Sequence, residues 1–312
     1  EVKNAKHLGA SKGDQLVLTA ISNGSGSSSA DGEAAGKASV VSNIIAMTMD
    51  AGVITSAIID AVQSNAEFGT DGSVAEDASG AVLSKNQLGE DYGLKQFSPI
   101  GKEWNEQTAA FCEYITGKTA SEVAGIALTE TTAPAEADLT SSVTIAVGDF
   151  MSLVEKAAAI AESMKTPVKT GYALTTNLTV ESAAAEADGS ATTDVSLIAV
   201  TVTEDGVIES CAIDAIQGKV AFDTKGQITT ELGEVLSKNE LGENYGMKAF
   251  SPIGKEWNEQ AAVFAEYVTG KTAEEVLGMS LTETTAPAEA DLASSVTIAV
   301  GDFMALIEKA AK

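Results

Sequence analysis

The sequence predicts an α+β protein made of two tandem copies of one small domain, each with an antiparallel sheet and helices. Three observations predict this class. The chain has 312 residues, enough for two modest domains. A long internal repeat divides it into two parts. Within each part, the spacing of apolar residues changes from the alternation of strands to the period of helices.

The repeat places the two copies end to end. The decapeptide at 98–107 recurs unchanged at 251–260, so that Trp104 and Trp257 correspond at an offset of 153 residues (257 − 104). Copies of about 150 residues suit whole domains better than the shorter units of a solenoid. We therefore predict one domain over residues 1–166 and a second over 167–312, joined near Lys165-Thr166-Pro167.

The early part of each copy has the pattern of a β-hairpin. In the second copy, residues 195–203 alternate apolar and polar side chains, Glu204-Asp205-Gly206 supplies turn residues, and residues 207–216 resume the extended pattern. The first copy repeats this pattern over residues 40–62. Each copy is therefore expected to begin with antiparallel strands.

The later part of each copy is predicted to be helical. Apolar side chains recur at helical spacing over residues 104–115, until Gly117 ends the helix. Residues 119–122 and 272–275 match the capping box of a short second helix. We expect Asp149 to cap a closing helix. The buried face of that helix is predicted to hold Phe150, Leu153, Val154 and Ala157.

Composition excludes several classes of function. The formal charge is −26 and the basic residues are all lysine, so nucleic-acid binding is close to excluded. One histidine, His7, and two cysteines, Cys112 and Cys211, do not make up the usual zinc, haem or iron–sulfur ligand sets. We expect the cysteines to be inert fillers of the core and His7 to lie at the surface. No apolar stretch reaches the roughly 18 to 20 residues of a membrane-spanning helix.

Two glycine motifs are interpreted as loops. Gly117-Lys118-Thr119 lacks the earlier glycine of a phosphate-binding loop, since Cys112 holds that place. The glycines within residues 22–36 lack dinucleotide-binding spacing, and residues 181–188 replace them in the second copy. We therefore predict a flexible hairpin loop over residues 22–36.

The stretch Glu103-Trp104-Asn105-Glu106-Gln107 has two interpretations. It is either a helix start, with tryptophan in the core and acids near the positive end of the helix dipole, or part of a pocket for a flat aromatic ligand. In the second interpretation the pocket is lined by Trp104 and Gln107, by their copies Trp257 and Gln260, and by the neighbouring aromatic residues of the sequence, Tyr92 and Phe97.

The most specific motif is the heptad Asp138-Leu139-Thr140-Ser141-Ser142-Val143-Thr144, repeated at 291–297 ahead of each closing helix. Small hydroxyl residues before a helix N-terminus are typical of an anion site, because free backbone amides and the helix dipole favour phosphate. The other interpretation is that these hydroxyl groups only cap the helix.

At this heptad the chain resembles the FMN-binding domain family, which is found in sodium-pumping NADH:quinone reductase and in lipoproteins of anaerobes. The Tyr-Gly-Met/Leu-Lys element, the Glu-Trp…Gln helix and the Gly-Lys-Thr turn are also similar to members of this family. The resemblance implies two FMN-binding-like domains. In the family, a flavin transferase joins FMN through its phosphate to the last threonine of the motif.

The resemblance therefore implies covalent FMN on Thr144 and Thr297. The other positions that fit the pattern are Asp138, Ser141, Ser142, Asp291, Ser294 and Ser295. The chain departs from the family pattern at two places in each copy. Leu139 and Leu292 stand where the family has a small residue, and Val143 and Val296 replace alanine.

Two functions follow from these observations. The first is an extracytoplasmic electron carrier, lipid-anchored at a bacterial surface through an anchor absent from this chain, matured by a flavin transferase and serving a redox partner. The second is a surface binding or structural protein that keeps the fold without flavin, which the bulky heptad positions favour. A carrier or binding role is preferred over an enzyme, since no repeated Ser–His or Cys–His constellation occurs.

Overall fold

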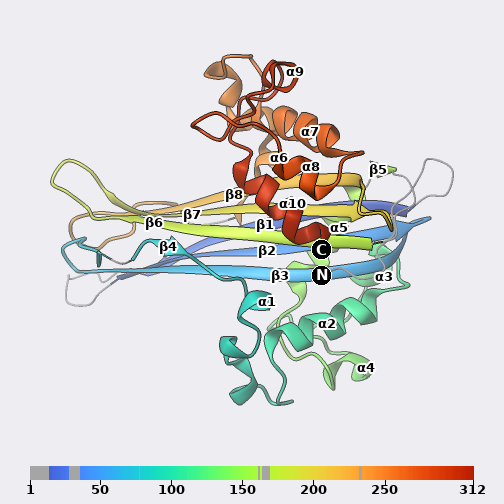
Figure 1. Ribbon diagram of the computed structural model, residues 1–312. Helices are drawn as coiled ribbons and strands as arrows, with labels where there is room; N and C mark the ends of the chain where they lie inside the picture. The colour runs from blue at the N-terminus through green and yellow to red at the C-terminus, as the bar shows by residue number, and fades with distance from the viewer. Residues whose placement is uncertain (1–13, 28–35, 77, 161, 164–168, 232–233) are drawn as a thin grey trace.

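The computed structural model describes residues 14–27, 36–76, 78–160, 162–163, 169–231 and 234–312 and shows an α+β protein (Figure 1). Two antiparallel sheets of long strands lie face to face across the middle of the molecule. Helices lie on their two outer sides. We call residues 14–160 the first half and residues 169–312 the second half.

The same series of secondary-structure elements occurs in both halves. The first half contains β1 (Asp14–Ser27), β2 (Gly36–Asp50), β3 (Val53–Phe68), β4 (Gly80–Ala81), α1 (Lys85–Leu88), η1 (Gly89–Tyr92), η2 (Leu94–Gln96), α2 (Trp104–Ile115), α3 (Ala120–Ala124), α4 (Ala137–Thr140) and α5 (Gly148–Ile160). A short strand, β5 (Glu162–Ser163), follows. The second half contains β6 (Lys169–Glu181), β7 (Gly189–Val202), β8 (Ile208–Phe222), β9 (Glu234–Val235), α6 (Lys238–Leu241), η3 (Gly242–Tyr245), η4 (Met247–Ala249), α7 (Trp257–Val268), α8 (Ala273–Leu277), α9 (Ala290–Ala293) and α10 (Gly301–Ala311).

The sheets exchange short strands between the halves. One sheet has the order β3-β2-β1-β5, and the other has the order β4-β6-β7-β8. The strand β4 belongs to the first half in sequence but pairs with β6, whereas β9 of the second half pairs with β1. The two halves therefore share hydrogen-bonded sheets, and the predicted joint at 165–167 lies outside the described residues.

The inner faces of the two sheets pack against each other. One cluster joins Ile44 and Val62 of the first sheet to Leu174, Leu197 and other aliphatic residues of the second. Further along the strands, the rings of Phe68 and Phe222 stack with centroids 4.0 Å apart and planes 3° from parallel. This interface buries side chains that a half by itself would expose to water.

The outer face of each sheet is covered by the helices of its own half. In the first half, α2, α3 and α5 pack on β2 and β3, and in the second half α7, α8 and α10 pack on β6, β7 and β8. Strand β2 is consequently buried on both faces over most of its described length. Polar residues on β2 pair with polar neighbours, as in the 2.8 Å hydrogen bond between the hydroxyl groups of Thr48 on β2 and Thr55 on β3.

The predicted hairpins are confirmed. Strands β2 and β3 pair antiparallel around Ala51 and Gly52, and both of these residues have positive φ angles, 50° and 83°. Strands β7 and β8 pair in the same way around Gly206, with φ 76°. Glycine adopts this conformation without steric cost, which explains the turn chemistry of both sequences.

The loop predicted over residues 22–36 is wrong for its first part. Residues 22–27 continue β1 and pair with residues 37–42 of β2. Glycine and serine are poor strand formers in isolation, but this segment is held between β2 on one side and, at Asn23, β9 on the other. Residues 28–35 lie outside the described part of the chain.

The predicted helices are confirmed, but one predicted cap is wrong. The first helix spans residues 104–115, and both capping boxes form at Thr119 and Thr272. Asp149 does not precede the closing helix; it lies in its first turn and accepts a hydrogen bond from Asn43 Nδ2 at 3.3 Å. The helix begins at Gly148, ahead of the residue that was expected to cap it.

Candidate ligand-binding site

The repeated heptad lies at the end of a short helix, α4 or α9, ahead of the closing helix of each half. Leu139 and Val143 are buried in the core, which explains why bulky residues stand at these positions. Thr144 is half-buried, and both its amide and its hydroxyl donate to Oε1 of Gln107, at 2.8 and 3.1 Å. Thr297 binds Gln260 with the same two distances.

Gln107 is a fully buried connector between three segments. Its Oε1 also accepts from the amide of Ile145 at 3.3 Å, while its Nε2 donates to Ser98 Oγ at 3.2 Å and to the carbonyl of Lys102 at 3.1 Å. In the second half, Gln260 makes the equivalent bonds to Ser251 and to Lys255. The glutamine that the sequence placed beside a ligand therefore binds the heptad itself.

The backbone amides of the first-half heptad are not free to bind an anion. The amides of Ser142 and Val143 donate to the carbonyl of Leu139, and those of Thr144 and Ile145 donate to Gln107. The closing helix begins only at Gly148, beyond the motif. Internal acceptors therefore already satisfy the donors around the threonine, so a phosphate there would have to displace these hydrogen bonds.

The acids of the Glu-Trp-Asn-Glu-Gln stretch have structural roles. Glu103 is 3% exposed and accepts hydrogen bonds from the amides of Leu94 and Lys95, at 2.9 and 3.0 Å. Its own amide donates to Glu106 at 2.7 Å. Trp104 is buried at the start of α2. The helix-start interpretation is therefore confirmed.

Lysine–aromatic contacts occur at the same place in both halves. The ammonium group of Lys85 lies 4.9 Å from the ring centroid of Tyr92 and 5.1 Å from that of Trp104. Lys238 lies 5.0 Å from Tyr245 and 5.2 Å from Trp257. Such cation–π contacts keep the lysine beside the aromatic pair. The sequence reasoning missed these lysines, although the repeated Leu-Ser-Lys-Asn motif contains them.

Phe97 does not line a pocket with Trp104. Its side chain is 81% exposed, and its counterpart Phe250 is 89% exposed, each at the end of a short 3₁₀ turn. The prediction that placed Phe97 beside the tryptophan rested on closeness in sequence. The left-handed glycine that precedes the turn, Gly93 with φ 76°, redirects the chain.

A pocket of about 300 Å³ opens beside Trp257 in the second half. Its aromatic wall is formed by Trp257 and Phe303, whose ring centroids are 6.1 Å apart at 66°. The remaining lining residues are Ser196, Ala215, Lys238, Met247, Thr285, Ile298, Ala299 and Asp302. Ile298 and Ala299 directly follow the heptad threonine, so the segment after the motif lines the pocket together with the tryptophan, whereas the heptad residues themselves are not in its lining.

The pocket lies at the N-terminus of α10. Asp302 and Phe303 are in the first turn of this helix, and the residue before it, Val300, makes no side-chain cap. Uncapped amides and the helix dipole give this end of the pocket a partial positive charge, to which Lys238 adds. The Asp302 carboxylate opposes a full negative charge there. The pocket therefore suits a neutral polar group better than a phosphate.

The equivalent place in the first half has a larger side chain. Asn43 pairs with Ala61 across β2 and β3 as Ser196 pairs with Ala215 across β7 and β8. Asn43 extends to the carboxylate of Asp149, which corresponds to Asp302 in the repeat. A hydrogen-bonded asparagine thus stands in the first half where the second half has a serine and open space.

Neither cysteine belongs to this pocket. Cys112 is buried, and burial raises the pKa of its thiol to about 12, so it stays protonated and unreactive. Burial also raises the pKa of Cys211. Both are free thiols; Cys112 is buried, as predicted for a filler of the core, whereas Cys211 is only partly buried. His7 lies outside the described residues.

Two further kinds of feature are absent from the described residues. None of the helices there has the length and apolar character to cross a membrane. In the same part of the chain, His, Cys, Asp and Glu side chains form no group of three or more that could hold a metal ion.

Comparison of the chain with protein-family models, with curated proteins and with solved structures gives no match.

Proposed function

We propose that the chain is a binding protein that holds a flat heteroaromatic ring, without a covalent bond, in the pocket beside Trp257. The observation that carries the proposal is the open aromatic pocket at the uncapped N-terminus of α10. A volume of about 300 Å³ lies at the lower end of the range for small-molecule pockets. The matching position of the first half holds Asn43, so the binding role is assigned to the second half.

The lining indicates the chemistry of the ligand. Trp257, Phe303 and Met247 offer apolar and polarizable contacts to a ring. Ser196 and Thr285 offer hydroxyl groups, and Lys238 and Asp302 provide one donor and one acceptor of opposite charge. A ring with hydrogen-bonding atoms at its edge satisfies this set. Among the described residues that line the pocket there is no histidine to activate the serine or threonine, which favours binding over catalysis.

Riboflavin is a suitable probe because it carries such a ring and no phosphate. We expect it to quench the fluorescence of Trp257 in a Trp104→Phe background, in which Trp257 is the remaining tryptophan. Ser196→Asn, which places the first-half side chain in the pocket, should weaken binding at least about tenfold by overfilling it. The mirror substitution Asn43→Ser is the matched control and should leave Trp257 quenching unchanged.

Equal riboflavin affinity in Ser196→Asn and in the parent protein would contradict the proposal. Calorimetry of the same variants would show whether a change in fluorescence reflects binding. Thermal unfolding of Ser196→Asn separates a filled pocket from a damaged fold, since only the second lowers the melting temperature strongly.

A second candidate function is the flavinylated electron carrier of the FMN-binding family. It is favoured by one observation: Thr297 is half-buried and directly precedes Ile298 and Ala299 in the pocket wall. Bound FMN would supply a ring that accepts and passes on electrons. The chain would be extracytoplasmic and lipid-anchored, and would need a flavin transferase and a redox partner. Against it stand the hydrogen bonds of Thr297 to Gln260, which an ester at the hydroxyl would reduce.

Intact mass of protein made together with a flavin transferase tests this second function. A carrier gains the mass of one FMN less one water for each modified threonine, and Thr297→Val loses one such addition. An unmodified mass in the parent, with modification after Val296→Ala, would show that the native motif is inactive. An unmodified protein that binds riboflavin would support the non-covalent function and exclude the electron-carrier function.

A further inference from the structure

A second cavity, of about 380 Å³, lies at the junction of the two halves. Asp60, Asn86 and Gln87 line it from the first half, on β3 and α1. Tyr172 on β6 and Lys309 on α10 line it from the second half. It shares no residue with the pocket beside Trp257, and neither proposed function uses it.

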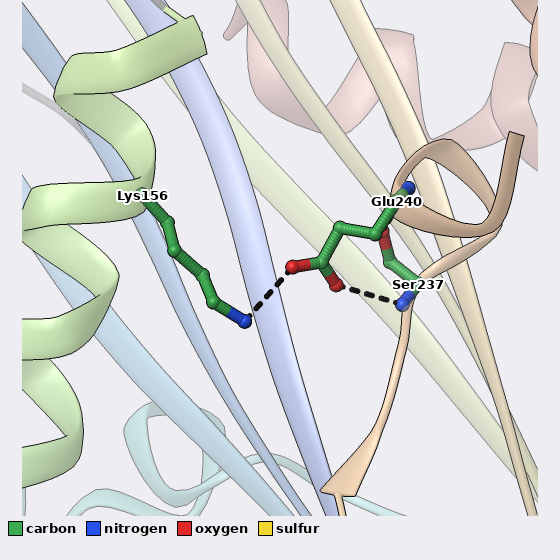
Figure 2. A network of polar contacts seen from close by, with 3 residues as sticks. All are labelled: Lys156, Ser237 and Glu240. Atoms are coloured by element: carbon green, nitrogen blue, oxygen red, sulfur yellow. Dashed lines mark hydrogen bonds and ion pairs between the residues drawn. The ribbon is translucent and has the colours of Figure 1, made fainter.

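At the related place on the other side of the molecule, an ion pair joins the two halves. Lys156 of α5 contacts Glu240 of α6, with 2.9 Å between Nζ and Oε1. The second carboxylate oxygen of Glu240 accepts from the amide of Ser237 at 2.9 Å (Figure 2). Lysine, carboxylate and helix N-cap thus form one connected network that joins the two halves.

At the cavity, a neutral glutamine takes the place of the glutamate in the corresponding network. The repeat places Lys309 where the other half has Lys156, and Gln87 where it has Glu240. Gln87 still accepts from the amide of Ser84, at 2.8 Å, as Glu240 does from Ser237. Its amide is neutral, however, and within the described residues Lys309 takes part in no ion pair.

A buried hydroxyl adds an unused hydrogen-bonding group. The hydroxyl of Tyr172 is inaccessible to solvent and has no hydrogen-bond partner among the described residues. A buried polar atom without a partner is costly, and such atoms are uncommon in folded proteins. Asp60 is 2% exposed, and its Oδ1 accepts hydrogen bonds from the amides of Ala61 and Asn86, at 2.7 and 3.0 Å.

We propose that this cavity binds a small organic carboxylate, whose charge takes the place that the Glu240 carboxylate holds at the related site. Lys309 would pair with the carboxylate, and the side-chain amide of Gln87 would donate to it. Ile58, Ala173 and Leu174 line the remaining wall and would contact an apolar body. The nearby Asp60 disfavours a doubly charged anion such as phosphate.

Benzoate, with benzamide as its neutral comparator, tests the proposal by calorimetry on the full chain. We expect benzoate to bind at one site and benzamide at least about tenfold more weakly. Gln87→Glu, which restores the internal carboxylate, should abolish benzoate binding without lowering the melting temperature. Glu240→Gln is the matched control at the related site and should leave the cavity affinity within about twofold.

Lys309→Met gives a second variant in case Gln87→Glu does not fold, since Lys309 is exposed and its replacement disturbs no core contact. It should weaken benzoate at least about tenfold. Tyr172→Phe is a further control that should leave both benzoate affinity and stability nearly unchanged, because the hydroxyl is inaccessible and has no partner to lose. Unchanged benzoate affinity in either Gln87→Glu or Lys309→Met would overturn the proposal, as would equal affinity for benzamide.

The pH dependence of benzoate binding tests whether benzoate occupies this cavity. Besides Tyr172 and Lys309, the charged group that faces Asp60 is Lys85. A bound anion disfavours a second negative charge nearby, so benzoate should bind more tightly as Asp60 becomes protonated, from about pH 8 to about pH 5.5. Asp60→Asn should remove this dependence. A pH dependence that is the same in Asp60→Asn would show that benzoate binds elsewhere.

Discussion

At the scale of single residues, the buried glutamine of each half explains more of the site than the hydroxyl groups of the heptad. Gln107 satisfies two backbone amides and one hydroxyl with a single oxygen, and its amide nitrogen binds two further acceptors. A buried polar group with several partners is costly to remove, because every partner then loses its hydrogen bond. The heptad threonine therefore depends on the glutamine for its position.

The first prediction concerns this glutamine. Gln107→Met should lower the free energy of unfolding by roughly 2 to 4 kcal/mol, since it leaves buried donors unsatisfied. Thr144→Val removes one hydroxyl only and should cost about 1 kcal/mol. Urea unfolding measures both. Equal losses of unfolding free energy in the two variants would mean that Gln107 does not hold the heptad segment in place.

A second prediction concerns the buried carboxyl groups. Burial raises the pKa of Asp60 to about 6 and that of Asp214 to about 7, well above the value of about 4 expected in the unfolded chain. The folded state then binds more protons than the unfolded state between about pH 4 and 7. The stability contributed by each group is present below about pH 4 and is lost as the pH rises through its folded pKa.

The measurement is the free energy of unfolding across this range for the parent protein and Asp214→Asn. We expect the parent to lose stability with rising pH, by at most about 1.4 kcal/mol per pH unit from this group. Asp214→Asn should have a shallower slope, because asparagine can still accept the amide hydrogen bonds of Ala215 and Asn239 without titrating. Parallel slopes in the two proteins would contradict the assignment.

At the scale of elements, short helices depend on their caps. The four-residue helices α1 and α6 are too short to be stable by themselves, and each begins at a fully buried serine that closes a capping box. The serines also bind the buried aspartates, so each cap ties a helix to the middle of a long strand. This is how the residues beside the cavity at the junction are held in place.

The third prediction tests such a cap. Ser237→Ala should cost about 1 to 2 kcal/mol, because it removes the N-cap bond to the amide of Glu240 and the bond to Asp214. It should also raise the pKa of Asp214 further, since the serine hydrogen bond favours the ionised form. Chemical denaturation and NMR titration of the carboxyl carbon measure the two effects. A lower pKa in the variant would exclude this role of the serine.

At the scale of the whole molecule, the two halves are joined by contacts along their sheets. They share sheet pairs through β4 and β9, a stacked pair of phenylalanine rings and a common core of aliphatic side chains. Loss of one half would expose the inner face of the other sheet to water. The halves should therefore unfold together, although each has its own outer core under its helices.

The fourth prediction uses the two tryptophans as reporters of the two halves. Trp104→Phe leaves Trp257 to report the second half, and Trp257→Phe leaves Trp104 to report the first. Introduced into both backgrounds, Phe68→Ala should shift the two fluorescence transitions equally, by roughly 3 to 5 kcal/mol in free energy. A shift confined to the Trp104 signal would show that the halves unfold independently.

The sequence alone determined the α+β class, the hairpins and the helix starts, because these depend on turn residues, caps and apolar spacing that act over a few residues. The strand at residues 22–27 and the first-turn place of Asp149 could not be predicted in this way. Both depend on neighbours from distant parts of the chain, namely strands β2 and β9 for the segment and Asn43 for the aspartate.

The heptad shows the same division at the candidate site. Its spacing predicted free amides, but whether an amide is free depends on which acceptor the fold brings near it, and the fold brings Gln107. The halves also differ in side chains beside these spaces: Ser196 lines the open pocket where the first half has Asn43, and the neutral Gln87 lines the cavity at the junction where the second half has Glu240. A repeat in sequence records these differences, but only the packing of two halves against each other decides which of them leaves space for a ligand.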